Sequence, residues 1–379
     1  MKNLSNQNQL LPGKTIGIIG GGQLGRMMTI SAKEMGYDVV VLDPTPNSPC
    51  GQIADQQIIA KYDDLAAIKQ LSSLSDVITY EFENIDYEAL AWLETNANLP
   101  QGSKLLKVTQ DRGFEKQSIS EAGVEVAPYR LIDSIQDLEE AIEQLGTPCV
   151  LKTRRGGYDG KGQVVIKSME DVQIAVELLE VGACILEAWI PFEKEISVIV
   201  TRNSFGDTKT FPVAENIHYE NILQQTIVPA RITAKVEGKA IEIAMNLAKT
   251  FELVGTLAVE MFVTRDGEIY INELAPRPHN SGHYTIDACE TSQFEQHIRS
   301  VCNLPLGETT LLKPVVMVNV LGEHMEETLE IVKISSSAKL HLYGKKEAVI
   351  KRKMGHINIL GNTIDEALAK LEKIDVWCS

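Results

Sequence analysis

Two glutamates on either side of an Asp266-Gly267 dipeptide have the spacing to bind one divalent cation together. Asp-Gly between two apolar segments is typical of a two-residue hairpin turn. Such a turn places Glu260 directly opposite Glu273 on neighbouring antiparallel strands, with their Cβ atoms roughly 4.5–5.5 Å apart. The pattern therefore predicts a pair of facing carboxylates.

This face of the hairpin also carries Phe262 and Ile271, so we expect it to line a core. Two like charges at contact distance cost on the order of 3–4 kcal/mol at an effective dielectric constant of about 20. That cost is removed if one carboxyl is protonated, if an arginine such as Arg277 intervenes, or if a cation bridges the pair. We favour the cation, because Mg²⁺ takes one or two carboxylates plus substrate phosphates, and Asn272 adds an oxygen ligand.

The glycine-rich segment at residues 154–163, which we call the later glycine-rich loop, is expected to hold phosphates. Lys152–Ile166 reads KTRRGGYDGKGQVVI, and residues 154–163 carry four glycines and three cations. This composition lets the backbone approach an anion closely. Arg155 stands where a Walker loop needs its first glycine, so the segment is a hairpin over phosphates or a plain surface hairpin.

A second glycine-rich loop, Gly20–Gly25, fits the G-x-G-x-x-G pattern, and we call it the earlier glycine-rich loop. It lies between a strand and a helix, and Asp43 ends the next strand, as in dinucleotide-binding proteins. An NAD-dependent dehydrogenase is therefore one alternative. A helix N-terminus binds any anion, however, and tight packing of the strand on the helix also explains the glycines.

Composition restricts the class of protein. The chain has 379 residues, 44% of them hydrophobic, and a formal net charge of −16. It is long enough for two or three domains, and its charge argues against general binding to nucleic acid or to an anionic membrane. We expect no signal peptide, no membrane span and six reduced cysteines, which favours the cytoplasm.

The expected elements divide the chain into an α/β part and an α+β part. Strands alternate with helices from Lys14 to about Leu106, which predicts a parallel, doubly wound sheet. From Arg112 onward, helices mix with segments typical of antiparallel strands. From about Cys302 the chain has short strands and a closing helix. We therefore predict domains at 1–111, 112–301 and 302–379.

In its motifs and their order the sequence resembles the ATP-grasp ligases. Among these ligases it most resembles the group that carboxylates an aminoimidazole ribonucleotide in purine biosynthesis. The motifs span nearly the whole chain: GGGQLGRM, YEFEN, the Asp111-Arg112 pair, LKTRRGGYDGKGQ, EAWIPFEKEISV, AENIH, NELAPRPHNSGHYT and HLYGK. The resemblance implies an ATP-grasp fold: a doubly wound parallel-sheet domain, a central domain with a mobile lid at about 124–188, and a small β-rich C-terminal domain. It also implies a homodimer.

By this resemblance the nucleotide site is assembled from residues spread over the central domain. Arg112 and Lys152 reach the ATP phosphates, Glu195 holds the ribose hydroxyls and His218 belongs to the pocket. Glu260 and Glu273, with Asn272, form the magnesium site. The residues that cover the phosphates are Gly157, Tyr158, Asp159, Gly160, Lys161, Gly162 and Gln163, and those that line the adenine slot are Glu187, Ala188, Trp189 and Ile190.

The resemblance implies that bicarbonate becomes carboxyphosphate, with ATP cleaved to ADP and phosphate, before the amine attacks. Arg277, His279 and Asn280 are then expected to hold bicarbonate, and Asp159 is our candidate for handling the amine proton. Tyr158 and Asp159 approach the imidazole. The other residues expected at the ribonucleotide are Gln23 and Leu24, Glu81 or Glu83, and the basic cluster Lys345, Lys346, Arg352 and Lys353, which is alternatively a solvated basic face.

Two further alternatives remain open at this point. A formate-using ligase that acts on glycinamide ribonucleotide shares the ATP-grasp plan, and a nucleotide sensor would bind ATP without turnover. The stretch RPHNSGHYT resembles the bicarbonate enzymes more closely.

Overall fold

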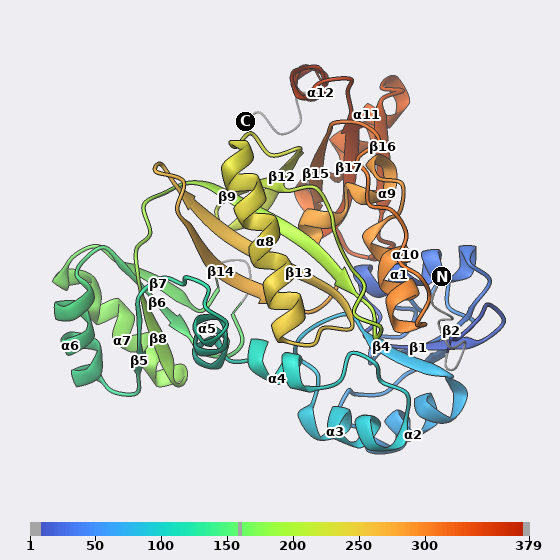
Figure 1. Ribbon diagram of the computed structural model, residues 1–379, viewed down its shortest axis with the longest axis horizontal. Helices are drawn as coiled ribbons and strands as arrows, with labels where there is room; N and C mark the ends of the chain where they lie inside the picture. The colour runs from blue at the N-terminus through green and yellow to red at the C-terminus, as the bar shows by residue number, and fades with distance from the viewer. Residues whose placement is uncertain (1–8, 158–160, 374–379) are drawn as a thin grey trace.

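In the computed structural model of the chain, the described residues form a parallel sheet, a small antiparallel sheet and a long antiparallel sheet (Figure 1). The structure describes residues 9–157 and 161–373. In this part of the chain, the helices are neither long nor apolar enough to cross a membrane.

The N-terminal part is a parallel sheet in the order β3-β2-β1-β4, as predicted. Strand β1 is apolar almost throughout because helices cover both of its faces. The elements are β1 (Thr15–Ile19), α1 (Gln23–Glu34), β2 (Asp38–Leu42), β3 (Gln56–Ile58), α2 (Leu65–Leu74), β4 (Val77–Tyr80), α3 (Tyr87–Asn96) and α4 (Lys104–Thr109).

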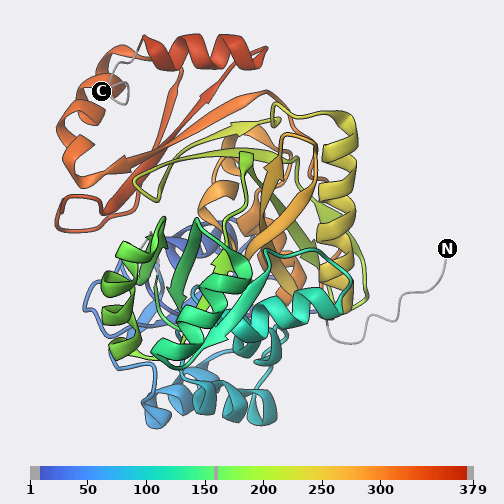
Figure 2. The ribbon, with the colours of Figure 1, turned by 90° about the vertical axis from the view of Figure 1, so that its left-hand side faces the viewer.

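Helix α5 (Arg112–Glu121) leads into a small antiparallel sheet in the order β5-β8-β6-β7, which projects from the body together with two helices (Figure 1). Its separate core includes Ile132, Leu151 and Leu186. In Figure 2 this unit lies in front of the N-terminal part. Its elements are β5 (Tyr129–Ile132), α6 (Ile135–Leu145), β6 (Cys149–Thr153), β7 (Gln163–Ile166), η1 (Met169–Asp171), α7 (Val172–Val181) and β8 (Cys184–Ala188).

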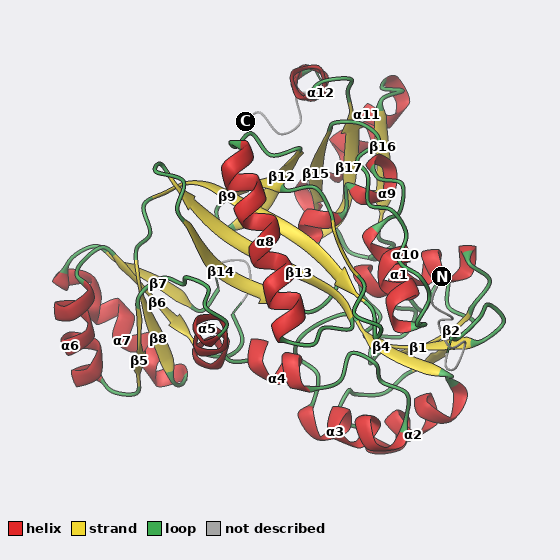
Figure 3. Cartoon of the chain, in the orientation of Figure 1, coloured by secondary structure: helices red, strands yellow, loops and turns green. Residues whose placement is uncertain are grey.

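The central sheet is antiparallel and carries α8 across one face (Figure 3). Apolar residues of α8 such as Ala244 and Leu247 pack there against Val198 and Leu257. The elements are β9 (Phe192–Arg202), β10 (Thr208–Thr210), β11 (Ala214–Tyr219), β12 (Ile222–Val228), α8 (Ala234–Thr250), β13 (Gly255–Thr264), β14 (Ile269–Ala275), η2 (Asn280–Gly282), α9 (Thr285–Ala288) and α10 (Gln293–Val301).

The C-terminal strands continue this sheet instead of forming one of their own. Its order is β14-β13-β9-β11-β12-β15-β17-β16, joined where Ile227 pairs with Val316. Tyr343 is buried in the N-terminal core beside Leu24 and Met28, so the last part of the chain contacts both others. The elements are β15 (Val315–Leu321), η3 (Gly322–His324), α11 (Met325–Ile334), β16 (Ala338–Leu342), β17 (Lys353–Leu360) and α12 (Ile364–Glu372).

Candidate active site

The β13–β14 turn has three residues instead of the two that we expected. The Thr264 amide donates to the Glu268 carbonyl at 3.0 Å, so the loop is Arg265–Gly267. Gly267 has a φ of +80°, which is the usual conformation of the third residue in such a loop. The extra residue shifts the pairs nearest the turn by one position.

A β-bulge at Asn272 restores the predicted pairing farther along the hairpin. Met261 lies opposite Ile271 and Glu260 lies opposite Glu273, so Asn272 has no cross-strand partner in this ladder. The predicted facing glutamates are therefore confirmed, although two compensating shifts produce them.

The glutamate face borders a core that includes Ala258 and Ala275, but the prediction that Ile271 lies on this face is wrong. Met261 and Ile271 belong to the core under α8, on the other face of the hairpin. Phe262, which lies on the same face as Glu260, stacks on Phe192 with 4.5 Å between ring centroids and 13° between planes. The glutamates therefore lie on the face of the sheet that does not carry the α8 core.

The pKa values of the two carboxyl groups are shifted in opposite directions. Burial, and then repulsion from Glu273, raises the pKa of Glu260 to about 8, and the Nε2 of His279 lies 3.3 Å from its Oε1. Burial also acts to raise the pKa of Glu273, but Arg112 and Lys152 outweigh it and the net shift is downward. The Arg112 Nη1 lies 3.3 Å from the Glu273 Oε2. The arginine beside the pair is thus Arg112, and not Arg277 as we considered.

Lys152 and Glu187 form a buried ion pair beside these groups. The Lys152 Nζ lies 3.1 Å from the Glu187 Oε2, and the Glu187 side chain is 4% exposed. Lys116, which the sequence analysis missed, lies 3.4 Å from the same oxygen. A lone lysine within a helix gives no signal in the sequence that it is buried.

The predicted ribose and adenine residues lie along one wall of the same site. The His218 Nδ1 lies 3.2 Å from the Glu195 Oε2. Burial lowers the pKa of His218, but Glu195 and Glu260 outweigh it, so this pKa is raised. Trp189 is 44% exposed and its ring centroid lies 6.5 Å from that of Phe192.

Backbone groups of the predicted adenine slot already have backbone partners in neighbouring segments. The Ala188 amide donates to the Pro128 carbonyl (2.8 Å), and the Ile190 carbonyl accepts from the Phe192 amide (2.8 Å). Of the groups that we expected to face adenine, the Ala188 amide is therefore already bonded.

The later glycine-rich loop joins β6 to β7 as predicted. Gly157 and Gly162 have φ values of +61° and +74°, and the Thr153 amide donates to the Gly162 carbonyl at 2.9 Å. Lys161 is exposed and Gln163 begins β7. The predicted site residues Tyr158, Asp159 and Gly160 lie outside the described residues.

Arg277 contacts the N-terminal part. Arg277 lies in the loop that follows β14, and its Nη2 lies 2.7 Å from the Glu83 Oε1. His279 caps η2 through Ser281, and the two polar side-chain atoms of the buried Asn280 have no partner among the described residues. Polar groups of the N-terminal part and of the central part therefore meet near Glu260.

The earlier glycine-rich loop is closed by carboxylates of the protein itself. Glu81 accepts hydrogen bonds from the amides of Gly22 and Gly25, the latter at 2.6 Å. Asp43 accepts from the Gly21 amide at 2.7 Å. The Gly22 and Gly25 amides at this helix N-terminus are therefore already bonded to Glu81.

The basic cluster is only partly assembled at this loop. The Lys345 Nζ donates to the Gln23 Oε1 (2.5 Å) and to the Lys353 carbonyl (2.7 Å). Arg352 donates to the carbonyl of Glu347 in its own exposed loop. The Leu24 side chain is buried in the N-terminal core, so only its backbone can reach a substrate.

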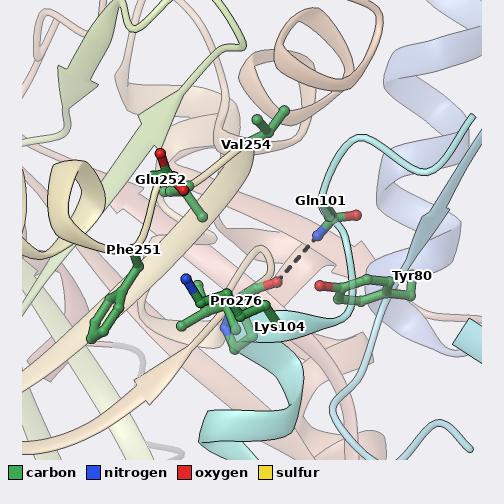
Figure 4. Close-up of a pocket in the computed structure, with 9 residues that line it drawn as sticks. Tyr80, Gln101, Lys104, Phe251, Glu252, Val254 and Pro276 are labelled. Carbon is green, nitrogen blue, oxygen red and sulfur yellow. Dashed lines mark hydrogen bonds between the residues drawn. The ribbon is translucent and has the colours of Figure 1, made fainter. Parts of the chain in front are cut away.

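The described residues also line two cavities. One, of about 150 Å³, lies between Tyr80, Gln101, Lys104 and Pro276, where Gln101 donates to the Pro276 carbonyl (Figure 4). The other, of about 510 Å³, is open and is lined by Tyr62, Gln110 and Arg155, among others.

Sequence comparison finds three families along the chain. The ribonucleotide synthetase preATP-grasp domain matches residues 13–110, the ATP-grasp domain matches 117–294, and the phosphoribosylaminoimidazole carboxylase C-terminal domain matches 315–370. The N5-carboxyaminoimidazole ribonucleotide synthase of Bacillus subtilis is 57% identical over 362 residues, which is 96% of this chain and 95% of the relative.

Solved structures give the same result. An ADP complex of an N5-carboxyaminoimidazole ribonucleotide synthetase superposes with a TM-score of 0.96, at 64% identity and 98% coverage of both chains. The Aspergillus clavatus synthase in complex with ADP and 5-aminoimidazole ribonucleotide has a TM-score of 0.90 at 31% identity, covering 96% of this chain and 98% of that one.

Proposed function

The chain belongs to the N5-carboxyaminoimidazole ribonucleotide synthases, which are ATP-grasp ligases, and we propose that the site around Glu260 and Glu273 performs the reaction of this family. It carboxylates 5-aminoimidazole ribonucleotide at the expense of ATP in purine biosynthesis. The observation that supports this site most strongly is the pairing of Glu260 with Glu273 beside Arg112.

The nucleotide phosphates are proposed to lie between these carboxylates and the later glycine-rich loop. Arg112 and Lys152 each end 3.3 Å or less from a carboxylate oxygen, and each can exchange this partner for a phosphate. Trp189, Phe192 and Phe262 offer aromatic surface for the adenine. The charge that builds up during phosphoryl transfer is thus met by fixed cations.

Glu260 and Glu273 suit Mg²⁺, and Asn272 is the third oxygen ligand that we propose. Two buried carboxyl groups of which one has a pKa raised to about 8 are expected where a cation is to be bound. In the described part of the chain no set of three or more His, Cys, Asp or Glu side chains is placed to hold a metal, so the nucleotide must complete the shell. Bound there, Mg²⁺ would neutralise phosphate charge.

Bicarbonate is proposed to bind at Arg277, His279 and Asn280. A bicarbonate oxygen takes the γ-phosphoryl group, which gives carboxyphosphate and ADP. The amine of the ribonucleotide then attacks the carboxyl carbon, phosphate leaves, and the amine loses a proton. Asp159 stays our candidate acceptor for this proton. Asn280 supplies for the carboxyl group a buried side-chain amide whose polar atoms have no partner in the described part of the chain.

The ribonucleotide is proposed to lie between the N-terminal part and the basic cluster. Lys345 and Gln23 already contact each other there, and Lys353 lies beside them. Because both oxygens of Glu81 accept backbone amides, Glu83 is the better candidate for the ribose hydroxyls. We keep Tyr158 as a proposed contact of the imidazole.

The dehydrogenase alternative has no support in the geometry. NAD needs the amides of the first glycine-rich loop for its pyrophosphate, and Glu81 and Asp43 occupy them. The formate-using ligase and the nucleotide sensor are likewise not favoured by any feature of this site.

Location and assembly are further proposals. We propose a cytoplasmic homodimer with domains at 1–111, 112–301 and 302–379. The five described cysteines are all buried and unpaired, which suits a reducing compartment.

A test of the function is ADP release measured with Mg²⁺, ATP and bicarbonate. We expect release only when 5-aminoimidazole ribonucleotide is added, and little without bicarbonate. Turnover with glycinamide ribonucleotide and formate instead would overturn the proposal. Binding of ATP with no release under any of these conditions would favour the sensor.

A further inference from the structure

One face of α5 is bonded to the strand that carries Glu273. Arg112, Glu115 and Lys116 are spaced i, i+3 and i+4, so their side chains leave the helix on the same side. Arg112 contacts Glu273 itself, at 3.3 Å. The Glu115 Oε1 accepts from the Leu274 amide at 2.7 Å, immediately after Glu273.

Lys116 is bonded to the backbone immediately before Glu273. Its Nζ donates to the Asn272 carbonyl at 2.9 Å and to the Ile271 carbonyl at 3.2 Å. These two carbonyls belong to the β-bulge, where the ladder between β13 and β14 is interrupted. Buried carbonyls without a partner are costly, so the ammonium stabilises an irregular backbone that β13 alone does not support.

The third contact of this ammonium is with the nucleotide site. The Lys116 Nζ lies 3.4 Å from the Glu187 Oε2, and Lys152 lies 3.1 Å from the same atom. Burial raises the pKa of Glu187, but Lys116 and Lys152 outweigh it and bring this pKa to about 2. Glu187 is thus held in its charged form, in which it pairs with Lys152.

Lysine matches these three acceptors in a way that arginine does not. An ammonium group has three donors in a tetrahedral arrangement, and Lys116 has three oxygen acceptors around it. Its side chain is 1% exposed, so there is no room for the larger planar guanidinium without movement of the bulge.

We infer that Lys116 is a positioning residue of the nucleotide site: it fixes the bulge at Asn272, and thereby the direction in which Glu273 presents its carboxylate to a nucleotide-bound divalent cation. This inference rests on the magnesium site of the proposed function. It assigns a role to a residue that touches neither nucleotide nor cation.

The test is calorimetric titration with ADP at a series of Mg²⁺ concentrations, for the wild-type chain and Lys116→Met. We expect the Mg²⁺ concentration for half-maximal tightening of ADP binding to rise about tenfold in the variant. The half-saturating concentration of 5-aminoimidazole ribonucleotide, from ADP release, should stay within twofold. Gln117→Met, an exposed change on the same helix, is the matched control and should leave both unchanged.

A purely structural role predicts a different result. The melting temperature and the active fraction would fall while the Mg²⁺ requirement of ADP binding stayed at the wild-type value, and this would overturn the inference. If Lys116→Met does not fold, Lys116→Arg keeps the charge but not the contacts to the bulge, and the same tenfold rise is expected. A wild-type Mg²⁺ requirement in Lys116→Arg would also overturn it.

The outcome is separable from that of the proposed function. If the wild-type chain binds ADP equally well with and without Mg²⁺, the magnesium site fails, whatever Lys116 does. If the wild-type chain requires Mg²⁺ and the variant requires it equally, only the role of Lys116 fails.

Discussion

The two glycine-rich loops of this chain look alike in sequence and differ in what meets their backbone. In the loop before α1, carboxylates of the protein accept the amides, as Glu81 does from Gly22 and Gly25. In the loop between β6 and β7, Gly156, Gly157 and Gly162 have positive φ values, and cationic side chains lie nearby on β6 and α5. A glycine pattern therefore predicts exposed amides but not their partner, which is set by residues far away in the sequence.

The largest loss of turnover is expected for a substitution in the site beside the later loop. Glu273→Gln removes the charge that faces Glu260 without changing the side-chain size, so a cation loses half of its carboxylate charge. We expect turnover to fall by about 10²–10³-fold, the scale of losing one preorganised electrostatic contact. ADP-release rates measure this.

The control for Glu273→Gln is Glu268→Gln, which lies at the exposed end of the same hairpin and pairs with Lys239. It should retain wild-type turnover. Full activity of Glu273→Gln at saturating Mg²⁺ would contradict the metal assignment and would remove the contrast between the loops.

A buried carboxyl behind the later loop should make stability depend on pH. Burial, as the largest cause, raises the pKa of Glu115 to about 8 from an ordinary value of 4.5. The folded chain therefore binds this proton more tightly than the unfolded chain. The contribution of Glu115 to stability is fully present below pH 4.5 and declines by up to about 1.4 kcal/mol per pH unit until pH 8.

Glu115→Gln keeps an oxygen for the Leu274 amide and removes this titration. Relative to the wild-type chain, the variant should gain free energy of unfolding as the pH rises from 5 to 8, as measured by urea denaturation. A stability difference that does not change over this range would show that Glu115 titrates normally.

A substitution at the earlier loop should lower the free energy of unfolding and leave the affinity for ADP nearly unchanged. Glu81→Ala leaves the amides of Gly22 and Gly25 without their acceptor, which costs about 1–3 kcal/mol. Urea denaturation reports the loss, and the affinity for ADP with Mg²⁺ should stay within threefold. If Glu81→Ala lowered the affinity for ADP strongly without loss of stability, the nucleotide would bind at the earlier loop, which contradicts our proposal.

The smallest effect is expected for a glycine of the later loop. Gly157 has a φ of +61°, and a Cβ there would lie 2.7 Å from the Lys161 carbonyl oxygen. Gly157→Ala should therefore raise the KM for ATP several-fold through local strain and leave that for 5-aminoimidazole ribonucleotide unchanged. Equal changes in both KM values would contradict a role confined to the nucleotide.

The sequence predicted the pairing of Glu260 with Glu273 correctly, but not the geometry that produces it. An Asp-Gly turn does not distinguish a two-residue loop from a three-residue one, and the bulge at Asn272 is bonded to Lys116 of α5, which is distant in the sequence. The parallel N-terminal sheet was predictable, because alternation of strands and helices leaves few other arrangements.

Contacts between distant segments were not predictable in the same way. Lys116 has no local pattern that shows its burial, and Glu83 meets Arg277 only because two domains pack together. The same holds for Tyr343, which reaches the N-terminal core from β16, and for Glu81, whose place at the α1 amides follows from the packing of β4 beside β1.

Glu260 and Glu273 are proposed to hold a divalent ion together with the nucleotide. Electron paramagnetic resonance of Mn²⁺, used in place of Mg²⁺, can detect this ion at the site. We predict that the wild-type chain retains Mn²⁺ tightly only when ADP is present, and that Glu273→Gln loses it. Mn²⁺ bound equally well without ADP, or equally well by the variant, would contradict the account.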